Sequence, residues 1–530
     1  MRPALDKFRY ELPAAAASGL LLTLAFPKIG QPALAFLALV PLLLTLRRAS
    51  FSNGFRLGFI AGLVHFISLV YWAAYTMKIY GHLPLYLCIP LLVLLAAYLA
   101  LYPALFAGLT TLIRHPVGLL FFVPVFWSAT EFMRAVLFTG FPWELLGYSQ
   151  YRSLAFIQVA DLTGVYGISF WLALNNAALL LATLGLRRKS WQGFAVSRKV
   201  IGGSGVLVLV VSSLMWGYGQ ARIRTLDREA AHAPRKKIAV LQGNIDQNKK
   251  WNRKFQRTTI ETYNSLADRA SRDKPALIVW PETATPFFIG HNRPMTDLLQ
   301  AGIRRTKTDH LIGTSTAISY DGRTAYHNSA ILFDAQSRIV DHYEKVHLVP
   351  YGEYVPFKEW LPFIGKMVAQ VGDFIPGQEG KAIAWQGGRL GVQICYEIIF
   401  PSLSRAMVEN QTDILVNITN DAWFGETSAP RQHFSMAVFR SIENRRALAR
   451  AANTGISGFI DPVGRILKAS RLNTPAALTQ SLPLMSTVSV YTRAGDFFAG
   501  GCLLVTLFVG GRNLIGRLRK RSGPAQPASV

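Results

Sequence analysis

Long apolar runs separated by short polar loops fill the N-terminal part of the chain, and one more such run lies near the C-terminus. About 20 consecutive apolar residues are enough for a helix to cross the hydrocarbon core of a bilayer. The pattern therefore predicts an α-helical transmembrane bundle of about eight spans. The runs lie at about Leu12–Phe26, Pro32–Leu46, Leu57–Tyr75, Leu83–Ile113, Val117–Phe138, Ile157–Leu186, Ile201–Tyr218 and Phe497–Gly511.

The pattern changes between residues 236 and 485, where short β-rich runs alternate with polar, helix-like segments. This alternation indicates an α/β domain of layered sheets and helices. The Arg- and Ala-rich segment Glu426–Ala452 is predicted as a further helix, and Asp461-Pro462-Val463-Gly464 as the turn of a hairpin. The expected strands are Lys237–Ile245, Ala276–Trp280, His310–Thr314, Ser329–Phe333, Leu390–Ile394 and Asp413–Ile418. Two further helices are expected at Arg253–Ser271 and Met295–Thr308.

Basic residues predict how the chain is oriented in the membrane. They precede the first run, follow the last, and crowd into alternate loops between the others. Because Lys and Arg mark cytoplasmic loops, both termini are predicted in the cytoplasm and the 219–495 segment on the opposite side. A cleaved signal peptide is the alternative for the first run, but no small-residue cleavage site precedes the second. The expected domains are a transmembrane domain of about seven helices at 1–220, an α/β domain at 221–490, a transmembrane helix at 491–515 and a cytoplasmic tail at 516–530.

Composition favours a membrane protein over one that binds nucleic acid. Hydrophobic residues make up 51% of the 530 positions, and charged residues only 16%. The net charge of +26 comes largely from residues in short loops, where they act as topology signals and do not form a groove for phosphates. No nucleic-acid partner is therefore expected.

Cysteine usage isolates one thiol. Cys88 and Cys502 fall inside apolar runs, which leaves Cys395 alone in the polar region, without a disulfide partner or a CxxC metal spacing. His347 and His433 also lack the paired spacing of a metal site, so neither a metal nor another cofactor is predicted.

Three reactive side chains occur at the ends of strand-like runs. Cys395 ends one run, Glu282 follows Trp280-Pro281, and Lys345 ends a third. A thiol, a carboxylate and an ammonium are the nucleophile, the general base and the oxyanion-stabilising cation of acyl transfer through a thioester. Taken singly, each has a structural alternative: a buried cysteine, a capping or surface glutamate, and a solvated lysine.

Together these segments resemble the nitrilase superfamily, whose Glu-Lys-Cys triad works in an αββα sandwich. Longer motifs narrow the resemblance to the apolipoprotein N-acyltransferases and extend it over essentially the whole chain. These motifs are Gln242-Gly243-Asn244, the segment His347–Pro356, the segment Asn420–Gly425, Gln432-His433 and the segment Phe138–Trp143. The resemblance implies that Glu282, Lys345 and Cys395 are catalytic and that the enzyme uses no cofactor.

The resemblance also implies a reaction. The cysteine attacks an ester of a phospholipid, typically phosphatidylethanolamine, and the thioester then passes its acyl chain to the N-terminal amine of diacylglyceryl-cysteine in an apolipoprotein. This is the last step of lipoprotein maturation, in the bacterial inner membrane, with the α/β domain facing the periplasm and the enzyme expected to be a monomer. Glu353, Tyr396 and Glu397 match positions around the triad, and Trp251 matches one associated with substrate handling.

The sequence also suggests a role for one apolar segment and leaves two alternative functions open. Tyr354–Ile375 is rich in aromatic and aliphatic residues and is interpreted as a lipid-facing flap, with packing onto the domain as the alternative. A membrane-tethered amidase would use the same triad with water as the acceptor. A transporter or scaffold would instead use intramembrane charges such as Glu131 and Asp161.

Overall fold

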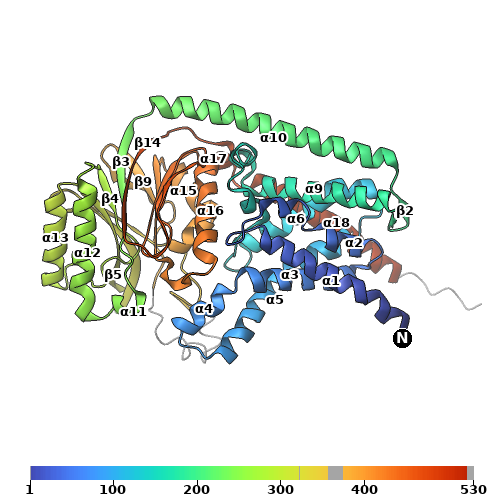
Figure 1. Cartoon of the computed structure of the whole chain (residues 1–530), viewed down its shortest axis with the longest axis horizontal. Helices are drawn as coiled ribbons and strands as arrows, with labels where there is room; N and C mark the ends of the chain where they lie inside the picture. Colours follow the sequence, from blue (N-terminus) through green and yellow to red (C-terminus); the bar gives the residue numbers. More distant parts are fainter. Residues whose placement is uncertain (1, 321–322, 356–373, 522–530) are drawn as a thin grey trace, which may run out of the picture.

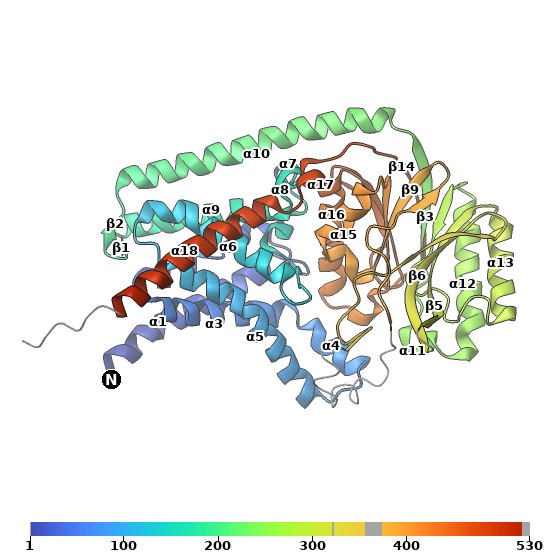
Figure 2. The ribbon, with the colours of Figure 1, turned by 180° about the vertical axis from the view of Figure 1, so that it is seen from behind.

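The computed structural model describes residues 2–320, 323–355 and 374–521. A helical bundle lies beside a body of two sheets covered by helices (Figure 1). Helix α10 (Arg198–His232) runs along one edge of the molecule from the far end of the bundle to the sheets. Helix α18 (Phe497–Arg521) leads back along the bundle, and its end lies near the N-terminus, away from the sheets (Figure 2).

The bundle contains the long apolar helices and several short helical pieces. Helix α3 crosses α5 closely because Gly58 and Gly62 bring the two backbones together: a Cβ at Gly58 would meet the Pro103 carbonyl oxygen at 2.4 Å. Small residues one turn apart are typical of such contacts between membrane helices. The elements are α1 (Arg2–Leu24), η1 (Pro32–Phe36), α2 (Val40–Leu46), α3 (Phe51–Leu69), α4 (Trp72–Ile79), α5 (Leu85–Thr110), η2 (Pro116–Gly118), α6 (Leu119–Val136), η3 (Leu146–Gln150), α7 (Leu154–Ile157), α8 (Ala160–Thr163) and α9 (Val165–Leu186).

Four helices of the described chain are long and apolar enough to cross a membrane: α5, η2 with α6, α9 and α10. A fifth is obtained if α3 and α4, which meet at a bend of 50°, are taken as one span. The predicted membrane character is therefore confirmed. Eight spans were expected, but only four or five in the described chain are long and apolar enough to cross a membrane. The difference lies in α1, which is not among these helices, and in the shorter apolar stretches Pro32–Leu46 and Phe497–Asn513.

The α/β part contains two six-stranded sheets packed face to face. Side chains from both sheets, among them Val240 and Val279 from one and Val392 and Val416 from the other, share one buried core. The first sheet has the order β14-β3-β4-β5-β6-β7 and the second β13-β12-β11-β10-β9-β8. The strands are β3 (Arg235–Gln242), β4 (Leu277–Val279), β5 (Asp309–Tyr320), β6 (Arg323–Phe333), β7 (Ile339–Glu344), β8 (Ile383–Trp385), β9 (Gly388–Ile394), β10 (Ile414–Thr419), β11 (Ala447–Ala452), β12 (Gly458–Ile460), β13 (Ile466–Ala469) and β14 (Ala476–Pro483).

Helices cover the outer face of each sheet and complete an αββα sandwich, as expected (Figure 1). Helices α12 (Arg253–Ser271) and α13 (Arg293–Thr306) lie on the side away from the bundle, and α12 has the predicted bounds. Helices α15 (Pro401–Glu409) and α16 (Ala429–Asn444) lie between the second sheet and the bundle. The remaining short elements are β1 (Ser190–Trp191), β2 (Phe194–Ala195), α11 (Gln247–Lys250), η4 (Cys395–Ile399), η5 (Asp421–Phe424) and α17 (Val490–Ala494).

The single helix predicted over Glu426–Ala452 is wrong at its C-terminal end. Helix α16 stops at Asn444, Arg445 takes a left-handed conformation with φ of 54°, and the chain continues as β11. This strand is fully buried between β10 and β12, so tertiary packing overrides the helix propensity of its alanines. The predicted hairpin is confirmed, since β12 and β13 pair on either side of the turn at 461–464.

Helix α16 joins the sandwich to the bundle. Gln432 donates to the Pro27 carbonyl oxygen at 3.0 Å and accepts from the Trp143 indole at 2.9 Å. Just beyond the helix, Arg445 forms an ion pair of 2.7 Å with Asp161. These buried polar contacts fix the sandwich on the membrane helices.

Candidate active site

The three predicted side chains follow the ends of three strands that meet at one edge of the sandwich. Glu282 lies just after β4, Lys345 directly after β7, and Cys395 directly after β9. All three are buried, with 6%, 1% and 7% of their surfaces exposed. The Lys345 ammonium lies 3.8 Å from the Glu282 carboxylate.

The Glu282 carboxylate is held from two sides. Its Oε1 accepts a hydrogen bond of 2.8 Å from the Asn328 side-chain amide, and its Oε2 accepts one of 2.8 Å from the Asn420 backbone N–H. Lys345 has a second carboxylate partner, Glu353, at 2.8 Å. The Glu282 carboxylate and the Lys345 ammonium are therefore both held in place by hydrogen bonds.

Electrostatics keep the thiol protonated at rest. Burial raises the pKa of Cys395, the Glu282 charge raises it further, and Lys345 lowers it. Burial alone would lower the pKa of Lys345, but Glu353 and Glu282 outweigh it, so the pKa is raised and the ammonium stays charged. The arrangement suits a thiol that loses its proton to a neighbouring carboxylate only when it attacks.

The turn that carries the thiol is strained and anchored. Cys395 has a φ of 54°, in the left-handed region that is costly for residues other than glycine. The buried Glu397 carboxylate accepts from the backbone N–H of Ile394 at 2.7 Å and from that of Val346 at 2.6 Å. Glu397 thus ties the cysteine turn to the segment that carries Lys345. Burial raises the pKa of Glu397 to about 7, against the hydrogen bonds and Lys345, which lower it.

A second group of buried side chains contacts the backbone of Cys395. His433 on α16 donates from Nε2 to the Cys395 carbonyl oxygen at 3.1 Å, and its Nδ1 lies 2.9 Å from Asp421. Arg450 forms an ion pair with the other oxygen of Asp421 at 2.9 Å. Sequence reasoning assigned no catalytic role to His433 or Asp421.

The end of a bundle helix reaches this part of the site. Thr76 of α4 and Tyr80, just after this helix, donate to the carbonyl oxygens of Trp423 and Ala422, at 2.9 and 2.8 Å. The ring of Trp72, also on α4, packs edge-on against Phe424. An aromatic and apolar surface therefore leads from the bundle to the segment that follows Asp421.

The other predicted residues occupy different places around the centre. Tyr396 is half-buried and packs against Phe400, whereas Trp251 is 53% exposed. Glu353 contacts Lys345 directly. Most of the predicted flap, residues 356–373, lies outside the described residues.

Sequence reasoning missed Lys250 and Asn328, and it singled out Asn420 only as part of a family motif without a catalytic role; all three contact Glu282. A signal for Asn420 was present: it follows β10, and β10 pairs in parallel with β9, which Cys395 follows. Carboxyl ends of neighbouring parallel strands lie at one sheet edge, where sites form. Nothing in the local sequence singles out Lys250 from the neighbouring lysine.

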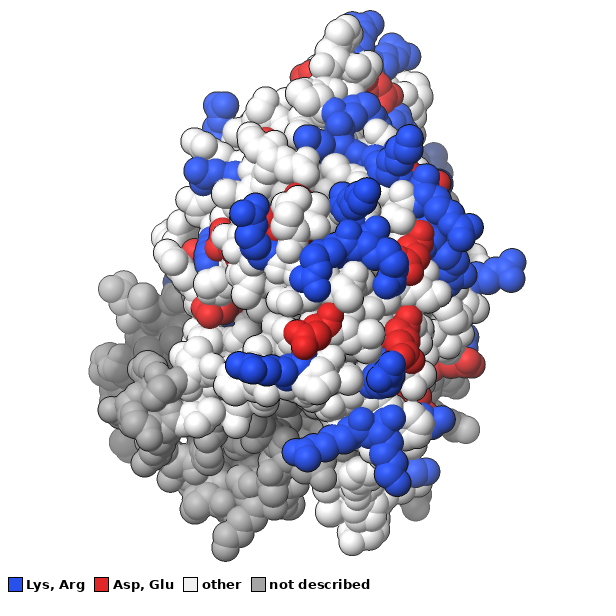
Figure 3. All heavy atoms as spheres, turned by 90° about the vertical axis from the view of Figure 1, so that its left-hand side faces the viewer, with Lys and Arg blue, Asp and Glu red and all other residues white. Residues whose placement is uncertain are grey.

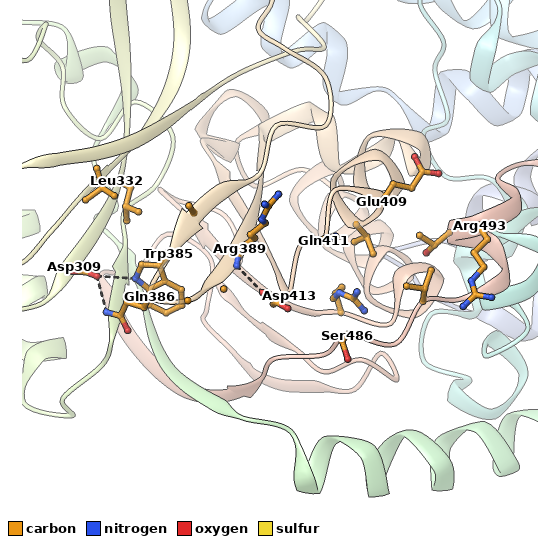
Figure 4. Close-up of a pocket in the computed structure, with 18 residues that line it drawn as sticks. Asp309, Leu332, Trp385, Gln386, Arg389, Glu409, Gln411, Asp413, Ser486 and Arg493 are labelled. Atoms are coloured by element: carbon orange, nitrogen blue, oxygen red, sulfur yellow. Dashed lines mark hydrogen bonds between the residues drawn. The ribbon is translucent and has the colours of Figure 1, made fainter.

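One cavity is separate from this site. It has a volume of about 950 Å³ and lies at the β8 edge of the second sheet, beside α17 (Figure 4). Asp309 accepts from the side chains of Trp385 and Gln386 on one wall, and Asp413 accepts from the Arg389 backbone on another. Across the described residues, no group of three or more His, Cys, Asp or Glu side chains is arranged to hold a metal ion.

Comparisons with known proteins identify the family. Residues 18–178 match the apolipoprotein N-acyltransferase N-terminal domain, and residues 237–490 match the carbon-nitrogen hydrolase domain. An amidase of the nitrilase superfamily from Nesterenkonia is 19% identical, with a TM-score of 0.38, over 50% of this chain and 97% of its own.

Curated relatives extend over nearly the whole chain. The apolipoprotein N-acyltransferase of Geobacter metallireducens is 43% identical over 92% of both chains, and that of Pasteurella multocida is 32% identical over 95% of both. Similarity of this extent includes the bundle as well as the sandwich. The chain belongs to the apolipoprotein N-acyltransferase family.

Proposed function

We propose that this protein transfers a fatty acyl chain from a phospholipid, phosphatidylethanolamine in the first instance, to the N-terminal amine of diacylglyceryl-cysteine in apolipoproteins. The observation that carries the proposal is the buried grouping of Glu282, Lys345 and Cys395 beside a helical bundle. Helix α4 brings apolar surface to the site, which suits a donor that stays in the lipid phase. Family membership favours this reaction over the hydrolysis of a small amide.

In the first half-reaction, Glu282 takes the proton of the Cys395 thiol as sulfur attacks the ester carbonyl. Lys345 holds the negative charge that develops on the carbonyl oxygen. The tetrahedral intermediate then breaks its bond to the glycerol oxygen, which takes the proton from Glu282. A lysophospholipid leaves, and the acyl chain remains on sulfur as a thioester.

In the second half-reaction, the acceptor amine attacks the thioester. Glu282 removes a proton from the attacking nitrogen and returns it to the departing thiolate, which regenerates Cys395. Lys345 again holds the charge on the carbonyl oxygen. The acceptor gains an amide-linked acyl chain, and the enzyme returns to its starting state.

Supporting roles are proposed for the residues around the triad. Glu353 orients Lys345 through their ion pair, and Glu397 fixes the turn of Cys395. Tyr396 lines the site next to the nucleophile. Exposed Trp251 is proposed to contact the arriving lipid, since its ring combines apolar surface with a polar N–H.

The proposed topology keeps eight spans, with the shorter apolar helices α2 and α18 and helix α1 added to those of sufficient length. The domain bounds are 1–220, 221–490, 491–515 and 516–530, in the inner membrane. The sandwich faces the periplasm and both termini face the cytoplasm, which is supported by the start of α1 and the end of α18 lying at the same end of the bundle (Figure 2). The enzyme is proposed to act as a monomer.

The direct test supplies both substrates. Purified protein is mixed with phosphatidylethanolamine of defined acyl chains and a synthetic diacylated lipopeptide. Mass spectrometry should show the lipopeptide gaining one acyl group, with an equal amount of lysophospholipid, and Cys395→Ala should abolish both products. Release of ammonia from small amides without any acylated lipopeptide would contradict the proposal and favour an amidase.

A further inference from the structure

A second lysine lies buried next to the glutamate of the triad. Lys250 ends the short helix α11, and only 2% of its surface is exposed. Its ammonium donates to the backbone carbonyl oxygen of Glu282 at 3.3 Å. The next residue in the chain, Trp251, is exposed, so the chain turns from the buried site to the surface within one residue.

The Lys250 ammonium has unused hydrogen-bonding capacity. It carries three N–H donors, and the Glu282 carbonyl is its one acceptor among the described residues. Within the same part of the chain, no carboxylate lies within 4.0 Å of it, whereas Lys345 has two such partners. A buried cation without a counter-ion is costly, so its retention calls for an anion that is present only during the reaction.

Lys250 belongs to the same bonded group as the Glu282 carboxylate. Gln247, on the same short helix, accepts a hydrogen bond of 2.6 Å from the Asn420 side chain, and the Asn420 backbone donates to Glu282. Burial lowers the pKa of Lys250 to about 8, while the charge on Glu282 raises it. The lysine therefore lies beside Glu282, and it is mainly protonated at neutral pH.

We propose that Lys250 is a second catalytic cation, whose free N–H groups stabilise the thiolate of Cys395 while Lys345 holds the carbonyl oxyanion. The inference rests on the proposed function, because it takes Cys395 as the nucleophile. The thiol proton still goes to Glu282, and Lys250 neither gains nor loses one. Its charge lowers the energy of the sulfur anion before and during attack.

Several other groups lie near the Cys395 thiol and also affect how easily it ionises. The charged ones are Glu282 after β4, Lys345 after β7 and Asp421 in η5, and His433 on α16 binds the cysteine backbone. Variants at Lys250 leave all of these unchanged. A change in thiol reactivity can thus be assigned to the lysine.

The test measures alkylation of Cys395 by iodoacetamide from pH 6 to 10, with the site read by peptide mass spectrometry. Lys250→Met is compared with wild type, with Lys250→Arg, which keeps the charge, and with Lys249→Met. Lys249 is the matched control because it is adjacent in sequence but exposed. Lys250→Met should react about tenfold more slowly at pH 7, because the sulfur anion loses about 1.4 kcal/mol of stabilisation. Lys250→Arg should recover most of the rate, and Lys249→Met should match wild type.

Thermal unfolding separates this role from a structural one. Methionine has a similar length and removes a buried charge, so Lys250→Met should keep or raise the Tm. If folded Lys250→Met is alkylated at the wild-type rate across the pH range, the proposal is overturned. It is also overturned if both Lys250 variants have a lowered Tm and Lys250→Arg does not recover the alkylation rate. Alkylation needs no lipid, so failure of acyl transfer from phosphatidylethanolamine would count against the proposed function and leave this result to stand separately.

Discussion

At the scale of single residues, the site combines a protonated thiol with carboxylates and ammonium groups already in place. Burial and Glu282 raise the pKa of Cys395, and paired carboxylates keep Lys345 charged. In the proposed mechanism, reactivity therefore depends on cations placed close enough to stabilise the anion at the moment it forms. Such preorganised charges act strongly because the site excludes water.

Replacing the ammonium that faces both carboxylates should slow the chemistry without preventing binding. Lys345→Met is expected to reduce the rate of acyl-enzyme formation by roughly 10²–10³-fold, since it removes the oxyanion partner. Single-turnover mass spectrometry with phosphatidylethanolamine measures this rate. Exposed Lys274→Met serves as the control. Equal rates for Lys345→Met and wild type would exclude the assigned role.

The pKa of Glu397, raised by burial to about 7, predicts a pH dependence. Only the ionised carboxylate can accept from all the N–H groups that anchor the cysteine turn, and its ionised fraction falls as the pH drops below 7. The acylation rate should therefore decline on the acid side, with an apparent pKa near 7. A pH–rate profile checks this, and a rate that is unchanged down to pH 5 would contradict it.

At the scale of elements, the site forms because β4, β7 and β9 end at one edge of the sandwich. Helix α16 packs against η4, which begins at Cys395, and contributes His433 to the Cys395 carbonyl oxygen. The left-handed conformation of the cysteine is held by this contact on one side and by Glu397 on the other.

Removing the contact from α16 should loosen the nucleophile. His433→Phe keeps a ring but loses the hydrogen bonds to Cys395 and Asp421, and it should lower the free energy of unfolding by about 1–3 kcal/mol. The acylation rate should fall at least about tenfold, because a misplaced nucleophile loses attack geometry. Denaturant unfolding and single-turnover kinetics measure the two effects. Exposed His342→Phe is the control, and unchanged kinetics in folded His433→Phe would contradict the role.

Sequence patterns were sufficient for some elements and not for others, for physical reasons. The amphipathic α12 is predicted to the residue, because local periodicity determines a surface helix. Strand β11 was missed, because its alanines favour a helix until β10 and β12 surround them. Family-like motifs singled out Glu282, Lys345 and Cys395, whereas Lys250 and Asn328 reach Glu282 only through tertiary packing.

At the scale of the whole molecule, charge is distributed unevenly. Figure 3 shows that Lys and Arg gather on the outer face of the sandwich, over α12 and α13, far from the bundle. Some of these residues pair with acids on the same face, as Arg305 does with Asp268 and Arg257 with Glu261. The basic residues in the bundle loops remain the basis of the proposed orientation.

That orientation predicts which surfaces can be labelled from outside. Arg272 on the sandwich and Arg187 at the end of α9 are both exposed, and the three native cysteines are buried. With the outer membrane permeabilised, a membrane-impermeant maleimide should label Arg272→Cys in intact cells and label Arg187→Cys only after the inner membrane is lysed. The opposite pattern would reverse the proposed topology.

The central claim is that Cys395 carries the acyl chain, and intact mass spectrometry after incubation with phosphatidylethanolamine alone tests it most directly. Wild-type protein should gain the mass of one fatty acyl group, which hydroxylamine removes and peptide mapping places on Cys395, while Cys395→Ala gains nothing. Adding a diacylated lipopeptide should discharge the adduct onto its amine. Folded wild-type protein that forms no adduct, or one that carries it on another residue, would contradict the account.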